Sequence, residues 1–254
     1  ENTIIDGNQN GSVVTFNSNE SNEASLENFT IQNGLSQNIY DQVNMTSGGG
    51  VFCKNSNVNL KNLIIKDNLA QAGGGLICIN SNPQIDDVQF INNYAETAAG
   101  GGIFLHQSSP EISNIIVYNN FSITGGGGLC AMYSSSPTIE NSVFYNNRSD
   151  EAAGHALAFD TNANITLINS ILFGPLEEES DLIYGTMNAT YSIIQGGYEG
   201  DGNLGSDPLF CDPLNGDFTL AANSPAIGAG ENGSNIGALG VGCDPINFSL
   251  TINE

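Results

Sequence analysis

The segment GGGLICINSNPQIDDVQFINN, residues 73–93, contains each feature that recurs along this chain. A run of glycines leads into a short apolar stretch, a Ser-Asn-Pro turn follows, and a second alternating stretch ends in paired asparagines. The segments GGGIFLHQSSPEISNIIVYNN at 100–120 and GGGGLCAMYSSSPTIENSVFYNN at 125–147 repeat this order. Self-similarity at such a period is typical of solenoid proteins.

The second halves of the repeats give the period. They begin at Leu26, Leu60, Ile85, Ile112, Ile139 and Leu167, which are 34, 25, 27, 27 and 28 residues apart. Leucine-rich and small helical repeats have similar periods, but each copy here carries short β-rich stretches broken by Gly, Asn, Ser and Pro. We therefore predict an all-β, right-handed, single-stranded parallel β-helix of about seven or eight coils. Residues 1–195 would form the coils, and residues 196–254 a C-terminal closing segment of the same domain.

Alternation within a coil indicates which side chains point inward. The pairs Leu63 and Ile65, Val88 and Phe90, and their counterparts in later copies should stack along the axis, about 4.8 Å apart. Two further columns consist mainly of asparagine, which tolerates left-handed backbone and can bond to the same amide in the next coil. The first column is Asn28, Asn62, Asp87, Asn114, Asn141 and Asn169, and the second is Asn33, Asn68, Asn93, Asn120 and Asn147.

The composition limits the partners. The chain has 27 acidic residues against four Lys and Arg, a formal net charge of −23. Such a surface repels nucleic acid and anionic membranes. No run of about 20 apolar residues occurs, so no insertion into a membrane is expected. The chain begins at Glu1, without a Met and close to a strand-like Ile4-Ile5-Asp6-Gly7 segment. We therefore interpret the chain as a mature or excised piece of a larger precursor, with any signal peptide missing from this sequence.

The coil motifs resemble the pectate-lyase-like right-handed β-helix superfamily. The resemblance rests on GGGIxC and SSPxIxNxxFxxN coils and on the tail GDGNLGSDPLFCDPLNGDFTLAANSPAIGAG, residues 200–230, and covers about residues 20 to 245. It is closest to secreted bacterial cell-surface members. It implies the fold and a secreted or cell-surface location, but these proteins share no common reaction.

The five cysteines separate into two groups. Cys211 and Cys243 bracket the closing segment, and a disulfide between them would hold down the end of the solenoid. Cys53 and Cys78 fall in one inward column, and Cys130 lies in a coil with an extra residue. A Cys53–Cys78 bridge is possible by distance but requires parallel side chains to turn toward each other. The pairing of these three stays open.

The Gly-rich runs and the strands beside them suggest a binding surface. The glycines either allow tight turns or let a ligand approach the backbone. On the adjoining strand, an outward column could form an exposed aromatic strip that binds sugar rings or a surface protein. Alternatively, loops cover this strip, or a one-residue slip turns it inward. The candidate ligand-binding residues are Phe52, Phe104, His106, Tyr133 and Phe159.

The candidates for catalysis are few. His155 replaces a residue of a Gly run close to Arg148 and acidic residues, which could raise its pKa and make it an acid or base. Uronate lyases of the superfamily neutralise a carboxylate with Ca²⁺ or a basic residue and remove a proton with Lys or Arg, and hydrolases use clustered carboxylates. Neither pattern occurs in this sequence.

Calcium is the one cofactor that the sequence suggests, and no organic cofactor is expected. Two acidic stretches have oxygen ligands at short spacing. The candidate ligands are Glu177, Glu178, Asp181, Asp201 and Asp207.

Three functions remain open at this point. The first is a noncatalytic surface module that binds a polysaccharide, a cell-surface glycan or another surface protein, as in adhesion. The second is a polysaccharide lyase or glycoside hydrolase, with its site near His106, Arg148 and His155. The third is a structural spacer.

Overall fold

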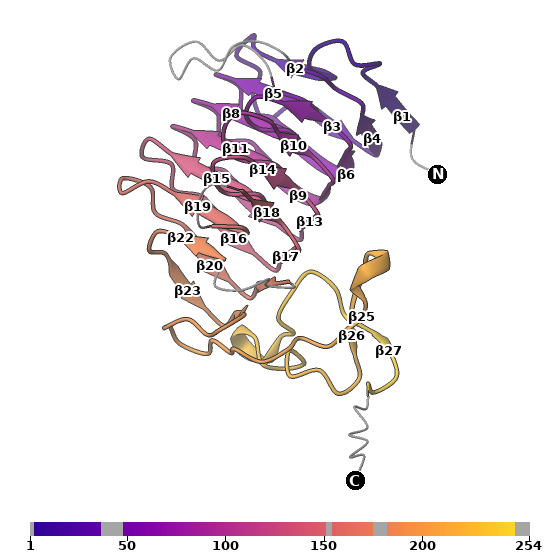
Figure 1. Ribbon diagram of the computed structural model, residues 1–254, viewed down its shortest axis with the longest axis vertical. Helices are drawn as coiled ribbons and strands as arrows, with labels where there is room; N and C mark the ends of the chain where they lie inside the picture. Colours follow the sequence, from indigo (N-terminus) through magenta and orange to yellow (C-terminus); the bar gives the residue numbers. More distant parts are fainter. Residues whose placement is uncertain (1–2, 37–47, 151–153, 175–181, 247–254) are drawn as a thin grey trace.

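The computed structural model describes residues 3–36, 48–150, 154–174 and 182–246. These residues form a parallel β-solenoid followed by a small separate sheet (Figure 1). Within the described ranges the helical elements are two three-residue 3-10 helices, η1 (Pro213–Asn215) and η2 (Glu231–Gly233). The predicted all-β class is confirmed.

Sheet A forms the longest wall of the solenoid. All its pairings are parallel, and the continuous strands β6 and β9 join its two halves. Its thirteen strands are β1 (Thr3–Asp6), β3 (Ser25–Glu27), β4 (Phe29–Gln32), β6 (Asn59–Lys66), β9 (Gln84–Ile91), β12 (Glu111–Ser113), β13 (Ile116–Tyr118), β16 (Thr138–Glu140), β17 (Val143–Tyr145), β20 (Thr166–Ile168), β21 (Ile171–Phe173), β23 (Asn188–Thr190) and β24 (Ile193–Ile194).

Sheet C forms a second parallel wall with one strand in each coil. Its seven strands are β2 (Val14–Phe16), β5 (Val51–Lys54), β8 (Leu76–Ile79), β11 (Ile103–His106), β15 (Leu129–Met132), β19 (Leu157–Phe159) and β22 (Ile183–Tyr184). Seven strands give about six turns from first to last, slightly fewer than the seven or eight coils expected.

A third, narrower sheet, which the sequence did not predict, follows Asn68 and its counterparts in the next three coils. Sheet B consists of the two-residue strands β7 (Leu69–Ala70), β10 (Tyr94–Ala95), β14 (Phe121–Ser122) and β18 (Arg148–Ser149). The rings of Tyr94 and Phe121 stack in it, with centroids 5.0 Å apart.

The core lies inside the three sheets, as the alternation predicts. Leu63, Ile65, Val88 and Phe90 are buried and stack on their counterparts in neighbouring coils. Cys53 and Cys78 are also buried and in register, and both thiols are free. Burial raises the pKa of the Cys78 thiol, with a contribution from Cys53 beside it.

Asparagine occupies two kinds of corner. The first predicted column adopts the left-handed conformation throughout, with φ from 48° at Asn62 to 64° at Asn28. In the second, Asn68, Asn93, Asn120 and Asn147 are buried and bond from amide to amide at 2.9–3.0 Å. Asn33 was wrongly placed in this buried ladder, because Gly34 takes the equivalent position and donates its N–H to Asn68.

The glycine runs that precede the strands of sheet C have a structural role. A Cβ on Gly49 would lie 2.2 Å from the Gly74 carbonyl oxygen, and one on Gly101 would lie 2.4 Å from the Phe121 carbonyl oxygen. Only glycine lets these backbones approach so closely. The contacts on the glycines thus come from neighbouring coils and from sheet B.

The outward column of sheet C is not exposed. Phe52, Ile77 and Phe104 form a second apolar cluster outside the solenoid core, which Ala72, Ala98 and Ala99 help to cover. The prediction of an exposed aromatic strip was therefore wrong. Phe159 points inward into the main core, since Ala158, not Phe159, is in register with Cys130.

The C-terminal segment forms the small sheet of β25 (Phe210–Asp212), β26 (Asp217–Ala221) and β27 (Val241–Cys243). The predicted Cys211–Cys243 disulfide is present. Contrary to expectation, this sheet packs against the outer face of sheet A, where Phe210 and Phe218 contact a cluster that includes Val143 (Figure 1). Tyr198 packs against the main core at the C-terminal end of the solenoid.

Candidate functional site

The corner between sheets C and A carries two parallel rows of exposed polar side chains. In each coil, two outward residues flank one buried residue, because successive side chains of an extended segment point to opposite sides. Asn82 and Gln84 flank the buried Pro83, and Ser109 and Glu111 flank the buried Pro110. The same arrangement repeats from coil to coil, so the rows run along the solenoid axis.

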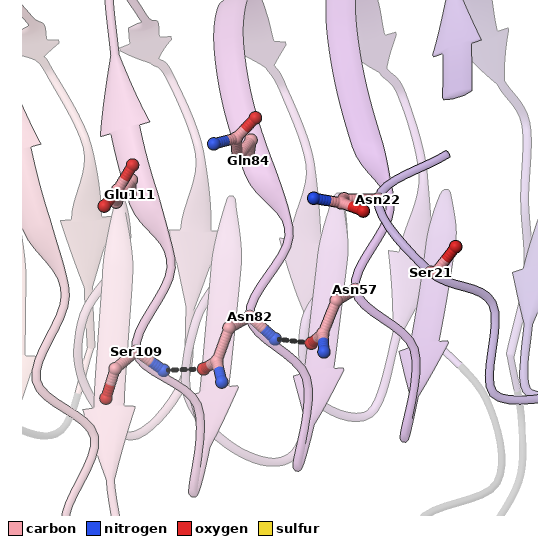
Figure 2. Close-up of a pocket in the computed structure, with 7 residues that line it drawn as sticks. All are labelled: Ser21, Asn22, Asn57, Asn82, Gln84, Ser109 and Glu111. Atoms are coloured by element: carbon pink, nitrogen blue, oxygen red, sulfur yellow. Dashed lines mark hydrogen bonds between the residues drawn. The ribbon is translucent and has the colours of Figure 1, made fainter. Parts of the chain in front are cut away.

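Hydrogen bonds fix the orientation of the first row. The Asn82 N–H donates to Asn57 Oδ1 at 2.6 Å, and the Ser109 N–H donates to Asn82 Oδ1 at 2.5 Å (Figure 2). The Ser136 N–H in turn donates to Ser109 Oγ at 2.8 Å. A backbone N–H needs an oxygen acceptor, so each amide must turn its NH₂ group away from the ladder. Asn57 and Asn82 therefore present NH₂ donors to solvent. The Ser109 hydroxyl, which accepts the Ser136 N–H, keeps its own hydrogen as a donor. We call these three residues the donor row.

The second row supplies acceptors. Gln84 and Glu111 begin strands β9 and β12 and stand beside the donor row (Figure 2). Together with Ser21 and Asn22 the two rows line a hollow of about 420 Å³, which we call the polar groove. Glu111 is the one ionisable side chain among the described residues that line it. A groove of this kind can hold a ligand with many hydroxyl groups, since a hydroxyl both donates and accepts.

The structure does not bring the proposed catalytic residues into this groove. His155 lies after sheet B, and its Nδ1 accepts the Ser149 N–H at 2.8 Å. Burial, and then the charge of Arg148, lower the pKa of His155, whereas a raised pKa was expected. Arg148 is exposed on β18. His155 is thus neutral near pH 7, with one ring nitrogen occupied by a backbone bond.

His106 and Tyr133 do come together, on another face. Their ring centroids are 4.4 Å apart, and the Tyr133 N–H donates to Asp160 Oδ2 at 2.8 Å. Burial lowers the pKa of His106, and its Nδ1 has no hydrogen-bond partner among the described residues. Tyr133 has φ 57°, which is unusual for a bulky residue. It occupies the corner position at which Asn80 and Gln107 also have positive φ. A binding role for this pair stays a prediction.

The predicted calcium ligands divide between two regions. Glu177, Glu178 and Asp181 lie outside the described residues. Asp207 accepts the Leu209 N–H at 2.8 Å, and the Asp201 carbonyl accepts the Tyr191 N–H. Across the ranges that the structure describes, no three His, Cys, Asp or Glu side chains form a metal-binding group. Calcium stays a prediction.

A second hollow lies on the outer face of sheet A, beyond the area that the C-terminal sheet covers. Its lining includes Ile4, Ile64, Ile91 and Tyr118, with the Lys66–Asp67 ion pair at 3.3 Å on one side. Its donors and acceptors are fewer and its apolar surface larger than those of the polar groove. We therefore consider the polar groove the better candidate for a polar ligand.

Sequence reasoning missed the groove because it interpreted the Ser-Asn-Pro and Ser-Ser-Pro motifs only as turns. The signal was present in the identity of the residues around the prolines. Each proline is buried, and the residues immediately before and after it are polar in three successive coils.

The described chain is therefore a parallel β-helix with a polar corner groove and a disulfide-linked C-terminal sheet. A family model described as a right handed beta helix region matches residues 16–192, and the chain belongs to this family. No curated protein and no solved structure matches it significantly. The described part of the chain contains no helix with the length and apolar character needed to cross a membrane.

Proposed function

We propose that this chain is a noncatalytic, extracellular carbohydrate-binding module that holds a glycan along the solenoid axis. The observation that carries the proposal is the polar groove, with fixed donors in one row and acceptors in the other. A sugar ring has hydroxyl groups on several sides and can contact both rows at once. The coil repeat offers equivalent contacts to successive sugar units.

The charge of the groove supports binding without cleavage. Hydrolysis of a glycosidic bond generally uses two carboxyl groups about 5 to 9.5 Å apart. Glu111 is the one carboxylate among the described groove residues. The net charge of −23 disfavours nucleic acids and strongly acidic glycans as ligands.

The test compares binding of uncharged oligosaccharides to the wild-type chain and to Asn82→Asp. Aspartate keeps the oxygen that accepts the Ser109 N–H but removes the exposed NH₂ donor. We expect binding to weaken about tenfold, the effect of losing one or two hydrogen bonds. The matched control is Asn235→Asp in the C-terminal segment, where Oδ1 likewise accepts a backbone N–H, from Gly228. This control should bind like the wild type.

The same assay separates the rival functions when product release is also measured. Formation of cleaved or unsaturated products would contradict the noncatalytic proposal and favour the enzyme. A lack of binding to every glycan in a broad panel would leave the structural spacer. Equal binding by Asn82→Asp and the wild type would place the ligand outside the polar groove.

A further inference from the structure

Glu111 supplies the one carboxylate among the described residues of the polar groove. It is exposed, and its carboxylate takes part in no hydrogen bond or ion pair among the described residues. The nearby Asp86, by contrast, bonds to Ser113 at 2.8 Å and to Asn114 at 2.7 Å, and lies 3.7 Å from Lys61. These hydrogen bonds, that of Asn114 first, lower the pKa of Asp86. The free carboxylate of the groove is thus that of Glu111.

The surroundings of Glu111 favour a positive ligand group. Glu140 is exposed one coil further along the same wall, and its strand pairs with the strand of Glu111. The two lysines of this wall, Lys61 and Lys66, already lie beside Asp86 and Asp67. The net charge of −23 on the whole chain adds a general field that attracts cations. A cation that reaches Glu111 is attracted both by this carboxylate and by the general field.

The position of Glu111 within the groove adds a chemical requirement. It stands next to Ser109, whose hydroxyl ends the donor row in the groove, and one coil from Gln84. A ligand that offers hydroxyl groups to both rows and a positive group to Glu111 matches the groove best, because a charged donor strengthens the hydrogen bond that the carboxylate accepts. A simple cation provides only the positive group, and an uncharged sugar provides only the hydroxyl groups.

We infer that the glycan is a polymer of amino sugars with free amino groups, whose ammonium groups pair with Glu111. This inference rests on the proposed function and names its ligand class. Because the pair would be exposed, its contribution should be modest and should decrease as salt screens it. The hydroxyl contacts with the donor row should depend much less on salt.

The test uses glucosamine oligomers and N-acetylated oligomers of the same length. At low salt we expect the free-amine oligomer to bind about tenfold more tightly, a plausible value for one exposed charge pair in a negative field. At about 1 M salt, where the screening length is about 3 Å, this preference should largely disappear. Glu111→Gln keeps an acceptor oxygen but removes the charge, so it should remove the preference for the free amine at low salt.

A matched variant separates the site from the overall charge. Glu231→Gln changes the net charge by the same amount but lies in η2 of the C-terminal segment, outside the groove. It should keep the preference for the free amine. An equal loss in Glu231→Gln would overturn the inference, as would equal binding of a linear polyamine, because the ligand would then be a cation rather than an amino sugar.

The failures of the two proposals are distinguishable. If the acetylated oligomer binds as tightly as the free amine at low salt, the amino-sugar inference is wrong, and glycan binding in the groove still stands. If neither oligomer nor any other glycan binds, the proposed function itself is wrong.

Discussion

The buried asparagine ladder (Asn68, Asn93, Asn120 and Asn147) and the donor row of the polar groove, which forms an exposed ladder, use the asparagine side chain in different ways. In the buried ladder, Asn93 Oδ1 accepts both the N–H and the NH₂ of Asn68, and its own NH₂ donates to Asn120 Oδ1 and to the Ile65 carbonyl. In the exposed ladder, Asn82 Oδ1 accepts the Ser109 N–H, and the NH₂ group faces solvent. One amide is fully used by the fold, and the other keeps half of its bonding capacity for a ligand.

This difference decides which repeated residues are structural. Repetition of asparagine at the coil period favours a structural role, since stacked amides satisfy polar groups at corners. The exposed ladder has the same period and the same kind of bond, but its amides do not bond to each other through their NH₂ groups. Periodicity alone therefore does not distinguish a scaffold from a binding surface. The number of side-chain NH₂ groups that donate hydrogen bonds within the fold does distinguish them.

The largest effect should come from Asn93→Asp in the buried ladder. The substitution removes two donated hydrogen bonds and places a carboxylate where the side chain is 1% exposed. We expect a loss of at least about 4 kcal/mol in the free energy of unfolding, measured by urea denaturation, because an unpaired buried charge is costly. If that variant does not fold, Asn93→Ser tests the same hydrogen bonds without a buried charge. Its free energy of unfolding should decrease by less, about 2 kcal/mol. Near-wild-type stability of both would show that the buried ladder is not structural.

A smaller effect should follow from Ser81→Ala, which tests a ladder that the sequence did not reveal. Ser56, Ser81, Ser108 and Ser135 are buried, and the Ser56 N–H donates to Ser81 Oγ at 3.0 Å. Removing this acceptor leaves a buried N–H unpaired, which should cost about 1 to 3 kcal/mol. The exposed Ser109→Ala is the control for urea denaturation, with an expected loss below about 1 kcal/mol. A larger loss in the control than in Ser81→Ala would reverse the comparison.

Lowering the pH should destabilise the fold through protonation of the histidines, whereas the hydrogen bonds of the amide ladders should not change. Amides and hydroxyls do not titrate in this range, but burial holds the pKa of His106 and of His155 below the ordinary value of 6.5. The unfolded chain then binds more protons, so this stability is complete above about pH 6.5 and decreases as the pH falls through the folded values. The urea midpoint should therefore decrease between pH 7.5 and 5. In a His106→Gln, His155→Gln double variant the decrease should be smaller, and an unchanged decrease would assign it to other groups.

The sequence predicted the repeating parts of the fold well because they depend on local chemistry. Left-handed corners favour Asn or Asp, and the inward stacks require alternating apolar residues, so both can be recognised in the sequence. The assignment failed at Phe159, because its coil, like the coil before it, has one more residue between the sheet C strand and the sheet A strand than the earlier coils have. An insertion in a turn shifts the face of every residue counted across it.

The candidate site was less predictable because it depends on hydrogen-bond partners in neighbouring coils. Sequence alone shows that Asn57 and Asn82 are equivalent, but not that their oxygens are occupied and their NH₂ groups exposed. The position of the C-terminal sheet on the outer face of sheet A depends in the same way on Phe210 and Phe218 meeting distant strands.

The smallest effect on stability should come from Asn82→Asp, the exposed counterpart of Asn93→Asp. Aspartate retains the acceptor for the Ser109 N–H, and solvent hydrates its charge. A carboxylate is also a stronger acceptor than an amide, which offsets the added repulsion from Glu111 nearby. We expect a change within about 0.5 kcal/mol in the free energy of unfolding, as for most surface substitutions. The same change that disrupts the buried ladder should thus leave the exposed one intact while weakening glycan binding. A loss of several kcal/mol would show instead that the groove amides stabilise the fold, and a weaker glycan affinity in this variant would then no longer identify the polar groove as the binding site.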